Sequence, residues 1–169
     1  IGILVLFISF VLWRLPRVEL GHSAAFKKRR TLTWLPLGLT YSFLYFARYN
    51  LKAYQGIGLT EAEYAAVFGV GSMVYGLSLI VNGPLTDRLG GRTTILISAA
   101  GAALANIWMG YMAATGEHFG MKPVTAFTTA YGMNMFFQSF GAISIVKVNV
   151  AWFNLRERGR FGGIFGFMI

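Results

Sequence analysis

The chain has 169 residues, of which 56% are hydrophobic, 16% are aromatic and only 12% are charged. Soluble domains carry about 25% charged residues, so this composition does not supply the polar shell of a water-soluble protein. Because the chain contains no cysteine, disulfides, thiolate metal sites and cysteine nucleophiles are excluded. These features predict a protein whose solvent is lipid.

The chain opens with an apolar segment, residues 1–13, that is too short to span a bilayer, which takes roughly 20 residues. One interpretation is the apolar part of a signal peptide. The preferred interpretation is a truncated extra helix, an anchor or the end of an upstream span. Residues 14–30 follow and are interpreted as a basic linker.

Four segments are apolar and long enough to cross a bilayer as helices: residues 31–54, 64–86, 93–116 and 123–153. A further apolar run, residues 161–169, is interpreted as the start of a fifth span. Small residues recur inside the second and third segments, as expected where helices pack closely in lipid. The predicted fold class is therefore all-α, a polytopic helical membrane protein.

Lysine and arginine gather in every second connection: the segment 14–30, the loop 87–92 and the loop 154–160. Because Lys- and Arg-rich loops stay in the cytoplasm, these three segments are predicted to be cytoplasmic in an inner (plasma) membrane. The net charge of +9 then reflects topology. A nucleic-acid partner is not expected, because no soluble domain presents a basic face.

Metal and enzyme chemistry find no support in the sequence. The two histidines, His22 and His118, fall in predicted loops, and a zinc site needs three or four converging ligands. No nucleophile–base pair is recognisable either. We therefore expect no metal, no cofactor and no catalytic residue.

The connection after the second span reads GPLTDRLGGR over residues 83–92. It resembles the signature G-x-L-x-D-R-x-G-R-R/K of the major facilitator superfamily, with Gly91 replacing one basic residue. Gly83 would let a neighbouring helix approach closely, and Gly90 would supply a turn conformation that other residues avoid. Asp87 would accept hydrogen bonds from a helix N-terminus, where the macrodipole favours an anion.

The basic residues of this loop, Arg88 and Arg92, need an anionic partner, and Glu157 lies in the next cytoplasmic loop. Together with Asp87 they are predicted to form a charge cluster that stabilises the outward-facing state. The alternative is a solvated loop whose arginines only set topology. That alternative explains the arginines but not the aspartate and the glycines at these spacings.

A polar stripe is predicted on the first span, because residues three and four apart share a helix face. It consists of Tyr41, Tyr45, Arg48 and Lys52. An arginine in mid-bilayer costs about 2.5–3.5 kcal/mol on insertion scales and indicates function, and its guanidinium binds phosphate or carboxylate in two-pronged fashion. The stripe therefore predicts the wall of an anion-binding cavity. The alternative is that Arg48 extends to the far interface.

Residues 45–51, YFARYNL, resemble the Y-x-x-R-K-N-F segment of the organophosphate:phosphate antiporters, whose first-helix arginine binds the phosphoryl group. The family lysine is Tyr49 here. Gln138 and Glu157 match that family's F-Q…R…W-W…K-E-R-G stretch, with Lys147 where the family has an arginine. The resemblance implies that Gln138 and Lys147 join Arg48 in substrate binding. Alternatively, Lys147 extends to the cytoplasm.

The resemblance implies a carrier of two six-helix halves that holds its substrate near the midplane and works by alternating access. Residues 31–169 would supply spans one to four and the start of span five of the N-terminal half. The implied partners are phosphate or an organophosphate, membrane lipids and the C-terminal half. Two alternatives stay open: a carrier for another anion such as a carboxylate, and a receptor-like sugar phosphate sensor that does not transport.

Overall fold

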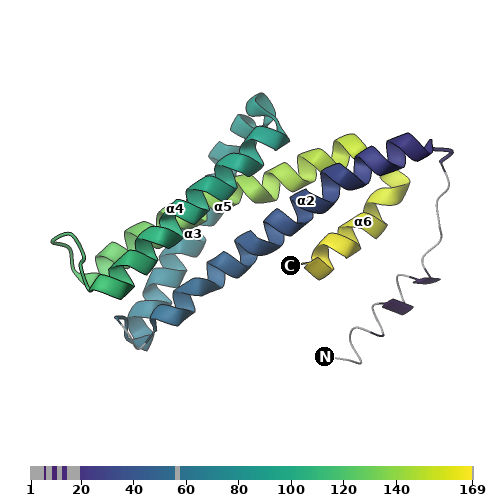
Figure 1. Cartoon of the computed structure of the whole chain (residues 1–169). Helices are drawn as coiled ribbons and strands as arrows, with labels where there is room; N and C mark the ends of the chain where they lie inside the picture. The colour runs from purple at the N-terminus through teal and green to yellow at the C-terminus, as the bar shows by residue number, and fades with distance from the viewer. Residues whose placement is uncertain (1–5, 7–8, 11–12, 15–19, 56–57, 169) are drawn as a thin grey trace.

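The computed structural model describes residues 6, 9–10, 13–14, 20–55 and 58–168 (Figure 1). Its named elements are α2 (Ala24–Tyr49), the 3₁₀ helix η1 (Asn50–Tyr54), α3 (Glu61–Leu89), α4 (Gly91–Thr115), α5 (Pro123–Trp152) and α6 (Leu155–Met168). Within these residues no strand forms beyond an isolated bridge between Gln55 and Leu59. The predicted all-α class is confirmed. The segment 1–13 lies largely outside the described residues.

The helix ends follow local sequence signals. At the start of α3, Thr60 Oγ1 accepts from the Glu63 backbone N–H at 3.3 Å while Glu63 Oε2 accepts from the Thr60 N–H at 2.9 Å, a reciprocal capping box. α5 begins with Pro123, a residue suited to the first helical position. α4 ends at Gly116, whose φ of +69° is left-handed.

The described residues contain three helices that are long and apolar enough to cross a membrane, namely α3, α4 and α5. They coincide with the second, third and fourth predicted spans. α2 is not among the three. It begins at Ala24, inside the predicted linker, so that Arg30 belongs to the helix. α6 likewise begins at Leu155, earlier than the apolar run from which a fifth span was predicted.

α5 packs between α3 and α4, and α2 runs along this group while α6 returns beside α2 (Figure 1). Close approach depends on small residues, as expected for helices in lipid. An added Cβ at Gly71 of α3 would overlap the ring of Tyr131, and one at Gly101 of α4 would overlap the ring of Phe137, both on α5. The packing of α5 therefore leaves no room for larger side chains at these two crossings.

Two apolar clusters form the interior. One includes Leu51, Met109 and Met135. The other includes Leu44, Ala102 and Ile145. The segment formed by α2 and η1 and the helices α4 and α5 each carry a polar residue between their contributions to the two clusters. These residues are Arg48, Asn106 and Gln138. A polar layer thus separates the clusters at mid-height of the bundle.

Candidate substrate site and charge pairs

Arg48, in the last turn of α2, is the centre of the polar layer. Its Nε donates a hydrogen bond to Gln138 Oε1 at 3.1 Å. The guanidinium carbon lies 4.4 Å from the ring centroid of Tyr45 and 4.6 Å from that of Tyr75. Cation–π contacts of this kind stabilise a desolvated guanidinium by up to about 2 kcal/mol. The side chain is therefore held by one amide and two aromatic faces.

The guanidinium lies at the middle of the candidate spans, although Arg48 stands at the end of its own helix. Tyr75 is the central residue of the 29 in α3. Gln138 is the sixteenth of the 30 residues in α5. In this conformation the arginine does not extend to an interface, which was the alternative to its placement in a cavity wall.

No carboxylate among the described residues lies within 4.0 Å of the Arg48 guanidinium. Arg48 is half-buried, and a charge that is taken partly out of water is normally paired or bound to a ligand, because its desolvation costs free energy. Aromatic faces and one amide oxygen leave the positive charge uncompensated. The Nε–Gln138 bond also leaves the two Nη groups available as a fork for an oxyanion.

The predicted polar stripe is only partly present. Tyr41 is buried and meets Tyr45 edge to face at 5.0 Å, so both tyrosines lie near Arg48. Lys52 is exposed on η1 and makes none of these contacts, so its place in the stripe is wrong. The α-helical spacing ends at Tyr49 because η1 turns with three residues instead of 3.6.

A chain of side-chain amides supports Gln138. Gln138 Nε2 and Asn106 Nδ2 both donate to Asn134 Oδ1, at 3.0 and 3.3 Å, and Asn50 Nδ2 donates to Asn106 Oδ1 at 3.3 Å. We call Asn50, Asn106, Asn134 and Gln138 the carboxamide chain. Only Gln138 of these four residues was predicted from the sequence as a site residue. Tyr75 was not predicted either.

Lys147 lies away from Arg48. Its Nζ donates to the backbone oxygens of Thr86 and Asp87 at 3.1 and 2.9 Å and to Asp87 Oδ1 at 3.0 Å. Lys147 stands nine residues beyond Gln138 on α5, roughly 14 Å along a helix. Its implied place beside Arg48 is wrong in this structure. The flexible ammonium instead caps the C-terminal carbonyls of α3, where the helix dipole favours a cation.

Glu157 is bound elsewhere than predicted. Arg30 Nη1 donates to both of its carboxylate oxygens, at 3.0 and 3.2 Å, and both residues are buried. The Arg30 guanidinium also lies 4.8 Å from the ring centroid of Phe153. The predicted cluster of Glu157 with Arg88 and Arg92 is therefore wrong in this conformation. α6 begins only two residues earlier and packs against α2, which directs Glu157 to Arg30.

Of the roles predicted for the glycines of the signature loop, the one at Gly90 is present and the one at Gly83 is not. Gly90 has a φ of +84°, so the predicted turn conformation is present. An added Cβ at Gly83 would meet no atom within 4 Å, and no described helix uses the close approach that was predicted there. Arg88 and Arg92 are exposed, and no ion pair joins either of them to the described carboxylates.

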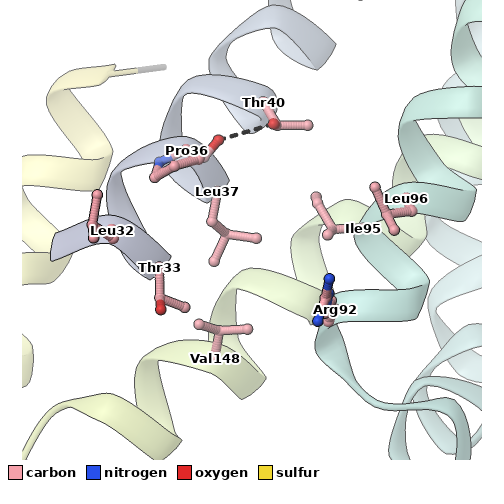
Figure 2. A pocket seen from close by; sticks show the side chains of 9 residues that line it. All are labelled: Leu32, Thr33, Pro36, Leu37, Thr40, Arg92, Ile95, Leu96 and Val148. Carbon is pink, nitrogen blue, oxygen red and sulfur yellow. Dashed lines mark hydrogen bonds between the residues drawn. The ribbon is translucent and has the colours of Figure 1, made fainter. Parts of the chain in front are cut away.

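A hollow of about 420 Å³ opens between α2 and α4 near the end of α5 (Figure 2). Its lining is mainly apolar and includes Leu37, Ile95 and Val148, with Arg92 at one side. These residues stand near the predicted cytoplasmic ends of their helices, more than two turns from Arg48 and Gln138. The hollow and the Arg48 site are therefore separate features.

Comparison with known proteins places the chain in a family. The sequence model of the Major Facilitator Superfamily matches residues 34–169. The chain is 26% identical over 143 residues to the membrane sensor protein UhpC of Salmonella typhimurium, covering 81% of this chain and 30% of that protein. It is 28% identical over 124 residues to the probable L-galactonate transporter of Escherichia coli, covering 69% of this chain and 24% of that protein.

The chain thus spans less than a third of the length of these relatives. No solved structure matches it. The family match covers four-fifths of the chain, including the signature loop and the polar layer. The chain belongs to the Major Facilitator Superfamily.

Proposed function

We propose that the chain is part of the N-terminal half of a secondary active transporter that moves a small organic anion across the inner membrane by alternating access. The observation that carries the proposal is the Arg48 guanidinium, which lies at the middle of the candidate spans and has no carboxylate partner among the residues that the structure describes. Galactonate is an organic anion, so the transporter relative supports an anionic substrate.

Exchange of an organophosphate for phosphate is the form of transport we propose. A guanidinium with a free Nη fork suits a phosphoryl group. Exchange also has an energetic reason, because bringing in an anion against an inside-negative potential costs about 2.3 kcal/mol per charge per 100 mV. Anion-for-anion exchange largely cancels that cost. The segments 14–30, 87–92 and 154–160 would face the cytoplasm in this arrangement.

The proposal is tested with the full-length protein in liposomes loaded with inorganic phosphate. We expect labelled phosphate to enter by counterflow and to equilibrate only when unlabelled phosphate is present inside. A second candidate function, sensing without transport, is favoured by the relatives that are named membrane sensors. Saturable phosphate binding without counterflow would support the sensor and contradict the transporter.

The pair formed by Asp87 and Lys147 is proposed to stabilise the outward-facing state. Asp87→Lys would set two ammonium groups against each other and withdraw Lys147 from the α3 carbonyls. Because conformational coupling in proteins amounts to about 1–3 kcal/mol, we expect phosphate counterflow to slow about tenfold. The double variant Asp87→Lys/Lys147→Asp should recover most of the rate.

Membrane insertion should be unaffected in both variants, because the pair is exposed at Asp87 and such pairs add less than about 1 kcal/mol to stability. Insertion and folding would be measured by yield and melting temperature in detergent. An unchanged counterflow rate in Asp87→Lys would remove the gating role from this pair.

A further inference from the structure

Three polar atoms on α5 are buried without any hydrogen-bond partner in the described part of the chain: Tyr131 Oη, Asn134 Nδ2 and Asn149 Oδ1. Asn149 lies beyond Lys147, near the end of the helix, whereas Tyr131 and Asn134 flank the polar layer. Both residues are 0% exposed. Leaving a buried donor unsatisfied costs about 1–3 kcal/mol, and native structures rarely keep such groups without a reason. A ligand that completes these bonds is one such reason.

The orientation of the Asn134 amide is fixed by its neighbours. Its Oδ1 accepts two hydrogen bonds, from Gln138 Nε2 at 3.0 Å and from Asn106 Nδ2 at 3.3 Å. Turning the amide over would set its NH₂ group against these two donors. Asn134 Nδ2 is therefore a donor that the carboxamide chain holds in place but does not use.

The ring of Tyr131, on α5, packs against the same face of α3 that Arg48 of α2 contacts. Its ring fills the space beside Gly71, and Arg48 lies over the ring of Tyr75, one turn further along α3. On α5, Tyr131, Asn134 and Gln138 follow one another at intervals of three and four residues and so share a face. Tyr131 and Asn134 therefore lie on the same face of α5 as Gln138, which binds Arg48.

All three groups are able to donate. The guanidinium and the amide NH₂ offer only donors on their free sides, and the tyrosine hydroxyl donates as readily as it accepts. A ligand that satisfies them together must bring acceptors, which is the chemistry of a phosphate or carboxylate oxygen. We propose that Asn134 and Tyr131 are the second and third hydrogen-bond donors to the oxyanion held by Arg48, an inference that rests on the proposed function.

Gln138 has a different role in this arrangement. Gln138 Oε1 accepts a hydrogen bond from Arg48 Nε, and Gln138 Nε2 donates one to Asn134 Oδ1. Gln138 therefore positions the guanidinium and leaves its Nη groups available for the anion. The carboxamide chain therefore connects the arginine on α2 with both additional donors. Buried acceptors such as Asn82 Oδ1 also lack partners, but no described hydrogen bond links Asn82 to Arg48.

The decisive variant is Tyr131→Phe, which removes one hydroxyl and no hydrogen bond made within the described protein. If Tyr131 only fills the core, the variant will bind phosphate as the wild type does and will be at least as stable. If the hydroxyl donates to the anion, the Kd for inorganic phosphate should rise about tenfold, the typical effect of losing a hydrogen bond to a charged group.

The measurement is equilibrium binding of labelled inorganic phosphate to the purified full-length protein, with the melting temperature recorded for every variant. Asn134→Asp keeps the Oδ1 acceptor for both amides but replaces the free donor by a carboxylate oxygen, and should abolish binding. Tyr111→Phe is the matched control, because this exposed hydroxyl donates to Glu117 Oε2 at 3.1 Å, outside the polar layer. The control should bind normally.

The Arg48→Ala variant separates this inference from the proposed function. Binding that is lost in Arg48→Ala but unchanged in Tyr131→Phe and Asn134→Asp would overturn the inference and leave the anion site intact. If the wild type does not bind phosphate, or if Arg48→Ala binds it equally well, the proposed function fails and this inference fails with it.

Discussion

Replacing Arg48 with alanine is expected to reduce phosphate counterflow to the level of liposomes without protein. The guanidinium is the positive charge at the centre of the described bundle, and no neighbouring lysine takes its place, because Lys52 is exposed and Lys147 is bound to Asp87. Stability should change little. The variant loses the hydrogen bond to Gln138 and two cation–π contacts, but it also removes a half-buried charge that makes no ion pair in the described part of the chain.

Lys52→Ala is the matched control, because it removes a cation four residues away on the same segment but outside the site. It should exchange phosphate at nearly the wild-type rate. Arg48→Lys should be strongly impaired even though the charge remains, because an ammonium lacks the planar fork. Equal rates in Arg48→Ala and Lys52→Ala would show that transport depends only on overall positive charge, and would remove the anion site from α2.

The apolar segments were the part of the fold that sequence predicted well. α3, α4 and α5 coincide with three predicted spans. A long apolar segment in lipid forms a helix because the helix satisfies all of its backbone hydrogen bonds internally. The ends were also predicted where a proline or a glycine stands, as at Pro123 and Gly116. The start of α3 at Glu61, after the Thr60 capping box, was predicted three residues too late. The start of α2 was not predicted, because its first turns are basic and gave no apolar signal.

The residues of the candidate site were likewise predicted only in part. Arg48 and Gln138 were predicted to belong to the same substrate site, and in the structure Arg48 Nε donates a hydrogen bond to Gln138 Oε1. The positions of Lys147 and Glu157 were predicted wrongly. Their long side chains bind Asp87 and Arg30 at helix ends, and these partners depend on how the helices pack against one another. Tyr131 could not be singled out from the sequence, since its role depends on the space that Gly71 leaves on another helix.

Removing the carboxylate of Glu157 is expected to destabilise the protein by about 3–5 kcal/mol, the usual cost of leaving one member of a buried ion pair unpaired. Arg30 would stay among the rings of Phe26, Phe153 and Phe161 without a counter-ion. The Asn154 backbone N–H would also lose an acceptor at the start of α6. The loss should appear in Glu157→Ala as a lower midpoint of unfolding in a detergent titration.

Asp87→Ala provides the comparison, because it removes a carboxylate whose pair is exposed and therefore contributes less than about 1 kcal/mol. The double variant Arg30→Met/Glu157→Met should recover most of the lost stability, since apolar residues of similar volume replace a buried pair at little cost. Equal effects of Glu157→Ala and Asp87→Ala would mean that water reaches Arg30 freely. In that case α6 would not be held on α2 by this ion pair, and the Arg30–Glu157 contact would have no more weight than a surface contact.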